Sequence, residues 1–383
     1  MSRLVRLGTL LPQGFRKMIR SLPGFDRLRA LILDRPRRTG VASGEPRAVV
    51  YLPTWERWDG MRQRPQYLMS AFARSGHPVY FVDNTERGGR IEDGVTIWRS
   101  LRDVPRSGVI IYIHFAPLRH LIDNFEDAVV IYDILDDLSI YDADEQGLPE
   151  RRKVRSHHPH LVETADVVIV SNRILAERHR SERPDLIEVG NGVDLELFGA
   201  PADRPEDMPA PDPEHPIVGY HGMISVWFDF DLLEAVMTER PDWRFVLVGP
   251  VSPEVADRLE TLRARPNLTL IGEQPSAAIP GYVQGFDVGV IWFQLNRMTE
   301  GVTPLKMYEY LAAGVPCVAT PLPACVDEDE VETAADADAM VAAIERALKA
   351  DPESLRSVAS AHSWEENLRP VLDRLDELGL RRV

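Results

Sequence analysis

The chain has 383 residues, of which 44% are apolar and 27% are charged, values typical of a soluble globular protein with room for two domains. Its net charge of −16 is unevenly spread, because residues 1–38 hold ten Lys or Arg against two Asp and so carry +8, which leaves −24 on the remainder. A body this acidic repels nucleic acid and excludes that class of partner, whereas the basic front end is attracted to anionic surfaces. Only Cys317 and Cys325 are present, so we expect no disulfide framework, no cysteine metal site and a reducing, cytoplasmic compartment.

Residues 1–44 are expected to form a basic amphipathic segment that precedes the folded body. From Leu4 to Leu33, apolar residues mix with Arg and Lys, with too many charges for a signal peptide. No apolar run in the chain approaches the roughly 20 residues that span a bilayer. One interpretation is a peripheral anchor on the inner face of the cell membrane, because each basic side chain near anionic lipid contributes about 1 kcal/mol. A flexible leader or a partner-docking arm is the other.

The folded body begins with an apolar strand from Ala48 to Leu52, a loop that reads P-T-W-E-R-W-D-G, and a helix expected from Gln66 to Ser75. This order places the loop at the carboxyl end of a parallel sheet, where open α/β folds bind ligands. Gly60 allows a ligand to approach the backbone, and Arg62 and Arg64 can meet its anionic groups. Alternatively, the tryptophans of the loop only cover the sheet edge.

Polar side chains also follow two later strands of this half. His114 comes directly after one strand and can orient a sugar hydroxyl or the acceptor, although an imidazole that caps a strand can also be structural. Asp133, Asp136 and Asp137 follow another, and carboxylates at this place suit general-base work on an acceptor hydroxyl, with Asp137 as the candidate. A loop that merely solvates these charges is the alternative. The strands expected here are Val79 to Val82, Val109 to Ile113 and Ala128 to Tyr132.

The alternation of strand and helix continues beyond a connector that is rich in proline, from Ala200 to Pro216. Apolar strands that alternate with helices indicate parallel sheets covered on both faces, and each half of the chain has this pattern. We therefore expect an α/β protein of two doubly wound, Rossmann-like domains that face each other across a cleft. The expected divisions are a front segment at 1–44, a first domain at 45–195, a connector at 196–216, a second domain at 217–363, and a last helix at 364–383.

The stretch from Thr299 to Thr320 has the strongest local pattern. Thr303 can cap a helix that begins at Pro304 and ends at Gly314, before an apolar strand. A helix start presents free N–H groups and partial positive charge to a phosphate, and Lys306 adds a full charge there. Glu309 lies on the same face about 4.5 Å further along the axis, where its carboxylate can accept from two vicinal hydroxyls. A plain surface pair of Lys306 and Glu309 is the alternative.

Part of this stretch, P-L-K-M-Y-E-Y-L-A-A-G-V-P-C-V-A-T, resembles the donor signature of retaining glycosyltransferases with the GT-B fold, family 4. Two other segments, P-T-W-E-R-W-D-G-M-R-Q-R-P-Q-Y-L and V-W-F-D-F-D-L-L, look like a branch of that family that acts in teichuronic acid biosynthesis. The resemblance covers about residues 47 to 375.

The resemblance implies roles for particular residues. The helix start, Thr303, Pro304, Leu305 and Lys306, would hold the diphosphate of a nucleotide sugar, and Glu309 would bind the ribose. Family members place a histidine in the region of His114. The resemblance also implies that the last helix crosses back to the first domain.

Two departures from the family pattern bear on this interpretation. Most members carry an arginine and a lysine just after the glycine loop that ends at Gly222, where this chain has Trp227-Phe228-Asp229-Phe230-Asp231. The missing charge would have to come from Arg62, Arg64 or Lys306. The family also has two glutamates eight positions apart, but eight positions before Glu309 stands Gly301, with Glu300 one place too far. The Gly301 to Thr303 backbone would then contact the transferred sugar.

The sequence therefore predicts a glycosyltransferase that moves a sugar, with retention, from a nucleotide sugar to a glycan or lipid-linked acceptor in cell-surface polysaccharide or glycolipid biosynthesis. We expect no cofactor and no catalytic metal, because no His or Cys cluster has metal spacing. A nucleotide-sugar epimerase on the same fold and a catalytically silent glycan-binding or assembly subunit are the alternatives. Sugar, base, acceptor and linkage are not specified by the sequence.

Overall fold

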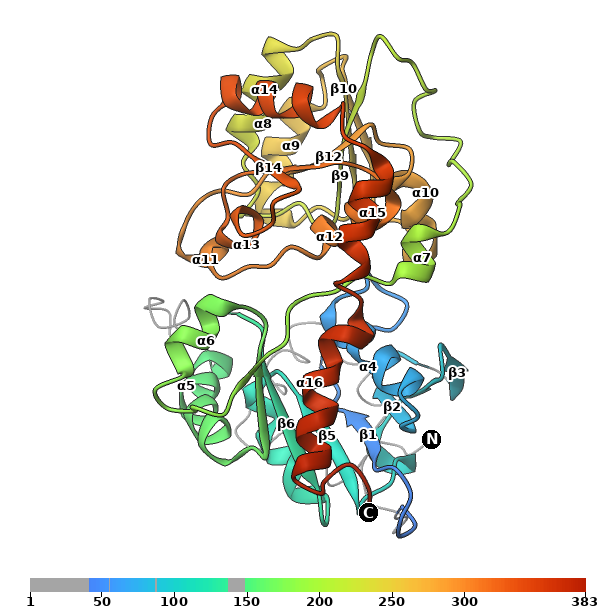
Figure 1. The fold of residues 1–383 in the computed structure, drawn as a ribbon, viewed down its shortest axis with the longest axis vertical. Coiled ribbons are helices and arrows are strands. Elements are labelled where there is room, and N and C mark those ends of the chain that lie inside the picture. Colours follow the sequence, from blue (N-terminus) through green and yellow to red (C-terminus); the bar gives the residue numbers. More distant parts are fainter. Residues whose placement is uncertain (1–40, 55, 87, 137–148) are drawn as a thin grey trace, which may run out of the picture.

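The computed structural model describes residues 41–54, 56–86, 88–136 and 149–383. They fold into two α/β domains, each built around a largely parallel sheet (Figure 1). The first sheet holds β1 to β8 and the second holds β9 to β14. Between β8 and β9 the chain passes through a short helix and then a stretch with no helix or strand up to residue 216.

The first sheet has the strand order β3-β4-β2-β1-β5-β6-β7-β8. All neighbours are parallel except β3 and β4, which form an antiparallel hairpin at the edge. Val49 of β1 pairs with Val79 on one side and Ile110 on the other, so the order reverses at β1. The strands are β1 (Ala48–Tyr51), β2 (Val79–Val82), β3 (Arg90–Glu92), β4 (Val95–Trp98), β5 (Val109–Ile113), β6 (Val129–Ile134), β7 (Val167–Val170) and β8 (Ile187–Glu188).

Both faces of the first sheet are covered, because alternate side chains of β1 enter two different apolar cores. Val49 and Tyr51 pack with α4 and α16, whereas Val50 packs on the face that carries α5 and α6. The helices are α4 (Arg64–Arg74), η1 (Leu101–Asp103), η2 (Ala116–Asn124), α5 (Pro149–Thr164) and α6 (Arg173–His179). Helix α7 (Leu195–Gly199) follows β8 and packs against α12 and α15 of the second domain.

The second sheet has the order β11-β10-β9-β12-β13-β14, which is the 3-2-1-4-5-6 order of dinucleotide-binding domains. The two central strands pair through Gly219 and Gly289. A Cβ on Gly289 would lie 2.4 Å from the Tyr310 ring, so glycine lets helix α12 lie close to the sheet. The strands are β9 (Ile217–His221), β10 (Arg244–Val248), β11 (Leu268–Ile271), β12 (Val288–Ile291), β13 (Cys317–Ala319) and β14 (Val331–Thr333).

The helices of the second domain also lie on both sheet faces, with α12 packed against α15 and α7, and α8 against α14. They are α8 (Phe230–Glu239), η4 (Pro253–Val255), α9 (Ala256–Leu262), η5 (Ser276–Ala278), α10 (Ile279–Val283), α11 (Arg297–Glu300), α12 (Leu305–Ala313), α13 (Pro323–Val326), α14 (Ala337–Ala347) and α15 (Pro352–Ser360).

The last helix, α16 (Trp364–Glu377), leaves the second domain and lies along the first (Figure 1). Its stripe of Trp364, Leu368, Val371 and Leu375 is at most 1% exposed and belongs to the core that contains β1 and α4. Leu372 lies beside this stripe and is partly buried, because the helical period brings Leu375 inward.

Some local expectations were wrong. Between the expected strands at Val79 to Val82 and Val109 to Ile113, the chain forms two further strands, β3 and β4, joined in a hairpin in which Asp93 adopts a left-handed φ of 50°. Strand β6 continues to Ile134, so Asp133 belongs to the strand and is fully buried rather than part of a solvated loop. Helix α12 has Pro304, not Thr303, as its N-cap, whereas Gly314 ends it in the left-handed conformation as expected.

Candidate active site

A cavity of about 960 Å³ lies between the two domains. It is bounded by the carboxyl ends of the central strands, with His114 after β5 on one side and His221 and Gly222 after β9 on the other. In each sheet the strand order reverses beside these strands, and such switch points are where open α/β sheets bind ligands. The topology therefore places two ligand-binding edges opposite each other.

Helix α12 brings the strongest positive charge to the second-domain wall of this cavity. Lys306, in its first turn, has its ammonium 4.9 Å from the Phe293 ring centroid and 5.1 Å from that of Tyr220. Among the residues that the structure describes, no carboxylate forms an ion pair with it. Burial lowers the pKa of Lys306 to about 8, although the nearby Glu309 opposes this shift. The cation is thus held by aromatic faces and remains available to an anionic ligand.

Gly222 makes the close approach of this lysine possible. Its φ is +118°, and a Cβ at this position would lie 3.1 Å from Lys306 Cε and 3.3 Å from Nζ. Any other residue would be strained and would displace the lysine. The predicted glycine loop and the predicted helix start therefore lie against each other at the cavity wall.

Glu309 lies one turn further along α12 and is 5% exposed. Its Oε2 is 3.1 Å from His221 Nε2, although the imidazole is not aligned for a hydrogen bond, and its Oε1 accepts a hydrogen bond from the Tyr67 hydroxyl at 3.3 Å. Tyr67 belongs to α4 of the first domain, and burial followed by the charge of Glu309 raises its pKa well above the ordinary value. The carboxylate that we expected to face a ribose thus lies where the domains meet.

The two aspartates that replace the expected basic pair do not face the cavity. Asp229 is the N-cap of α8 and accepts from the Leu232 amide at 2.9 Å, and Asp231 pairs with Arg258 at 2.7 Å. Trp227, from the same stretch, lines the cavity instead. The departure from the family pattern therefore removes positive charge without adding negative charge to the site.

The segment before α12 is held by side chains of the first domain. Asn172 Nδ2 donates to the Gly301 carbonyl and Asn191 Nδ2 to the Thr303 carbonyl, both at 2.6 Å. Glu300 points to Arg178, at 3.4 Å. Neither Glu300 nor Gly301 lines the cavity, and the contact of the Gly301 to Thr303 backbone with a donor sugar stays a prediction. Thr303, Pro304 and Leu305 do line it, as expected.

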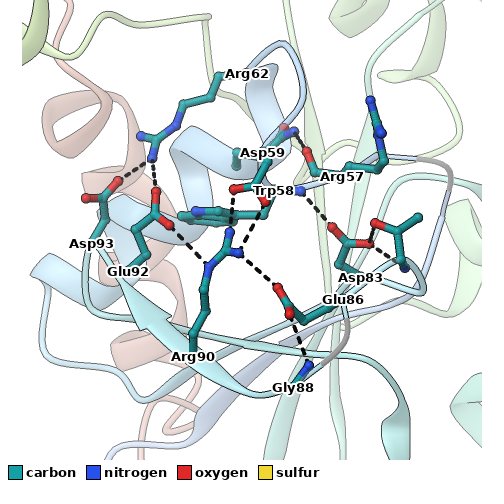
Figure 2. A network of polar contacts seen from close by, with 12 residues as sticks. Arg57, Trp58, Asp59, Arg62, Asp83, Glu86, Gly88, Arg90, Glu92 and Asp93 are labelled. Atoms are coloured by element: carbon teal, nitrogen blue, oxygen red, sulfur yellow. Dashed lines mark hydrogen bonds and ion pairs between the residues drawn. The ribbon is translucent and has the colours of Figure 1, made fainter. Parts of the chain in front are cut away.

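On the first-domain wall, Arg62 is already engaged by protein groups. Figure 2 shows its guanidinium beside Glu92 and Asp93 of the β3–β4 hairpin, with Glu92 Oε1 at 3.7 Å from Nη2. The same group lies 5.2 Å from the Trp58 ring centroid. Arg90 forms a second link, to Asp59 and Glu86 (Figure 2). The loop that contains Gly60, which lines the cavity, is therefore tied to the hairpin, and Arg62 serves this contact in the structure.

Arg64 is buried, and its guanidinium is also bound to protein groups. Its guanidinium donates to both carboxylate oxygens of Asp133, at 2.8 and 3.2 Å, and to Asn191 Oδ1 at 3.2 Å. Tyr112 also donates to Asp133. The buried Asp133 carboxylate needs such a partner, whereas Arg64 also lines the cavity, so its contact with a ligand phosphate stays a prediction. Arg64 links the first-domain core to Asn191, and Asn191 links to the start of α12.

The two other predicted residues of this domain have different outcomes. His114 lines the cavity, stacks on Tyr51 with ring centroids 5.7 Å apart, and has Nε2 at 3.3 Å from Glu56 Oε1. Both ring nitrogens are buried, so a role of His114 toward a ligand stays a prediction. Asp137 lies outside the described residues.

Tyr67 and Asn191 were not among the site residues predicted from the sequence. No local pattern marks Tyr67, because its partner Glu309 is 242 positions away. His221 did have a usable signal, since it stands at a strand end directly before the glycine that approaches Lys306.

The described residues contain neither a metal-binding cluster nor a membrane-spanning helix. No group of three or more His, Cys, Asp or Glu in this part of the chain is arranged to hold a metal ion. None of its helices is both long and apolar enough to cross a membrane.

Several solved structures share the architecture of this chain. Sucrose-phosphate synthase from Thermosynechococcus elongatus aligns with a TM-score of 0.63 at 19% identity, over 87% of this chain and 99% of that one. Anabaena HepE in complex with UDP and glucose aligns with a TM-score of 0.63 at 11% identity, over 87% and 100%. An Escherichia coli structure titled as bound with UDP-2-fluoro glucose gives 0.60 at 12% identity, over 88% and 99%. These likenesses confirm the predicted GT-B fold.

Parts of the sequence also match a related protein and a protein-family model. A Bacillus subtilis (strain 168) protein, TuaH, whose name describes a teichuronic acid biosynthesis glycosyltransferase, is 29% identical over 177 residues, which are 45% of this chain and 45% of TuaH. The match thus spans less than half of the relative. The family model described as glycosyl transferases group 1 matches residues 216–350, which include every strand of the second sheet. The second domain of this chain is therefore a group 1 glycosyltransferase domain, carried on the GT-B fold.

Proposed function

We propose that this protein is a glycosyltransferase that moves a sugar from a nucleotide sugar to a glycan or lipid-linked acceptor in the synthesis of a cell-surface polysaccharide or glycolipid. The diphosphate would lie at the start of α12 against Lys306, and the ribose against Glu309. The observation that carries the proposal is a lysine in the first turn of a helix, on the wall of a cavity between the domains, with no carboxylate paired to it among the described residues.

The chemistry follows from where charge develops. As the bond to the anomeric carbon breaks, negative charge accumulates on the departing diphosphate. A helix N-terminus and a cation that are fixed in advance stabilise that charge, and removal of one such donor typically costs about 2.7–4 kcal/mol. Lys306 and α12 supply both elements. This arrangement needs no metal, and we expect none.

The acceptor would lie on the first-domain wall, which contains Gly60 and His114. His114 lines the cavity with its Nε2 at 3.3 Å from Glu56 Oε1, and the proposal gives it the role of positioning an acceptor hydroxyl. Retention of the anomeric configuration belongs to the proposal because the signature at residues 304–320 resembles that of retaining enzymes. The name of TuaH supports an acceptor from cell-envelope polysaccharide synthesis.

Incubation with a panel of radiolabelled nucleotide sugars and a membrane extract tests this proposal. Labelled sugar that moves into a glycan or lipid fraction is the expected result. Isomerised donor would identify an epimerase, and binding without any conversion would identify a silent subunit. Lys306→Met is the control, because it should abolish transfer while the protein remains folded.

The ribose role of Glu309 is tested separately. Glu309→Gln retains one neutral acceptor oxygen, whereas the carboxylate makes charge-assisted bonds of about 1.5–3 kcal/mol. We expect binding of a ribonucleoside diphosphate to weaken by roughly ten- to a hundredfold. The 2′-deoxy form, which lacks one partner hydroxyl, should lose much less. Equal losses for both forms, measured by calorimetry, would show that Glu309 does not bind the ribose.

A further inference from the structure

The inference concerns how Glu309 is held, and it rests on the ribose role proposed above. Its carboxylate lies between one side chain from each domain. Oε1 accepts from the Tyr67 hydroxyl of α4, in the first domain, and Oε2 faces His221 of β9, in the second. Glu309, Tyr67 and His221 are 5%, 3% and 7% exposed, so water contributes little to fixing the carboxylate.

Tyr67 is itself fixed by its surroundings. Its ring stacks on Trp364, the first residue of α16, with centroids 5.3 Å apart and an angle of 10° between the planes. The Arg62 guanidinium lies 6.0 Å from the ring centroid. The packing between α4 and α16 therefore fixes the orientation of the Tyr67 ring. The fixed ring in turn sets the position of the hydroxyl that donates to Glu309.

A carboxylate oxygen has two acceptor positions. Tyr67 occupies one acceptor position of Oε1, and the His221 ring lies beside Oε2 without an aligned hydrogen bond, so each oxygen keeps a position for a ligand hydroxyl. A glutamate without these contacts would sample several rotamers, and ordering it would reduce the affinity for the ligand. The hydrogen bond from Tyr67 and the contact with His221 thus prepare the carboxylate for a vicinal diol.

We propose that Tyr67 is a positioning residue that orients Glu309 toward the donor ribose from the opposite domain. Donor recognition then requires both domains, although the family-matched segment lies in the second alone. The 3.3 Å separation is longer than the usual 2.5–3.0 Å of a bond between a hydroxyl and an oxygen. A small approach of the domains would shorten it, so donor binding and the closeness of the domains would favour each other.

The test measures discrimination between a ribonucleoside diphosphate and its 2′-deoxy form. Calorimetry first establishes which of UDP, ADP and GDP binds the full-length wild-type protein most tightly, and that nucleotide is then used throughout. We expect Tyr67→Phe to weaken the ribo form by about three- to tenfold and the deoxy form by less. The variant keeps the ring on Trp364, and thermal unfolding will verify that it stays folded.

A matched control and a double-mutant cycle separate positioning from a general structural effect. Tyr308→Phe removes another tyrosine hydroxyl that donates to a glutamate, Glu328 at 2.6 Å, and it should leave discrimination unchanged. In the Glu309→Gln background, Tyr67→Phe should cause no further loss of discrimination, because Tyr67 acts through Glu309.

Three outcomes would contradict the proposal in different ways. Unchanged discrimination in Tyr67→Phe, with reduced discrimination in Glu309→Gln, would overturn the role of Tyr67 alone. Tighter binding by Tyr67→Phe would show that the hydroxyl competes with the ribose and does not assist it. If Glu309→Gln leaves discrimination intact, or if the wild-type protein binds none of the nucleotides, the proposed function itself fails.

Discussion

Three features of its surroundings set the position and charge of Lys306. Gly222 leaves the space, Phe293 and Tyr220 supply aromatic faces, and α12 supplies the partial positive charge of its first turn. Burial lowers the pKa of this lysine to about 8, so its charge changes in an accessible pH range. If Lys306 binds the diphosphate, the affinity for the nucleotide therefore depends on pH near this value.

We predict that affinity for the nucleoside diphosphate falls as pH rises above about 8. Below that pH the ammonium is already charged, whereas above it the ligand must bind together with a proton, which weakens affinity by at most about tenfold per pH unit. Lys306→Arg is the matched control, because a guanidinium stays charged throughout this range. Calorimetry from pH 7 to 9.5 should show a slope for the wild-type protein and none for the variant, and equal slopes would exclude Lys306 as the source.

For single residues, the sequence predicts a site when the site residues lie close together in one helix, because their spacing then fixes their relative positions. Lys306 and Glu309 could be predicted because a helix start, a charge in its first turn and a carboxylate three residues later all lie within one short segment. The ion pairs of Arg62 and Arg64 could not be predicted, since their partners Asp93 and Asp133 lie 31 and 69 positions away. An arginine near a site looks the same in the sequence whether it binds a ligand or a buried aspartate.

Among the elements, α16 has the largest effect on how the domains are joined. It begins at the edge of the second domain, yet its buried stripe completes the core around β1 and α4. The amphipathic pattern made this predictable from the sequence. In contrast, β3 and β14 are only three residues long, and their pairing partners, not their own composition, make them strands.

We predict that Leu368→Ala lowers the free energy of unfolding by about 2–5 kcal/mol, the usual cost of a cavity left by a buried leucine. Leu368 is 1% exposed in the core shared with the first domain. Arg369→Ala, on the outer face of the same helix, should change stability by about 0.5 kcal/mol or less. Urea unfolding measures both, and a similar effect for the two variants would mean that α16 contributes little to the first-domain core.

At the scale of the whole molecule, the main feature is the contrast in charge between the acidic two-domain body and the basic residues 1–38. The described chain begins at residue 41, where the Val41 amide contacts the Ser107 carbonyl and Gly44 contacts the last residue, Val383. These residues lie at the amino ends of the β1 and β5 strands, opposite the cavity. The described part of the chain therefore begins at the end of the first domain that lies opposite the cavity.

We predict that deletion of residues 1–38 leaves a folded protein with unchanged nucleotide binding but without affinity for anionic vesicles. The segment carries +8, and each basic residue contributes about 1 kcal/mol near anionic lipid. Sedimentation with vesicles of phosphatidylglycerol and phosphatidylcholine, compared with phosphatidylcholine alone, measures this. Equal sedimentation of the full-length and shortened proteins would rule out the anchor.

The chain passes between the domains twice, and the two passages touch. The Val193 amide donates to the His362 carbonyl at 2.9 Å, and a Cβ on Gly192 would lie 2.9 Å from that same oxygen. Two connecting segments that lie side by side and share a hydrogen bond form a double hinge. Such a hinge bends in one plane more easily than it twists. The domains should therefore open and close along one path, and each closure would return α4 and α12 to the same register.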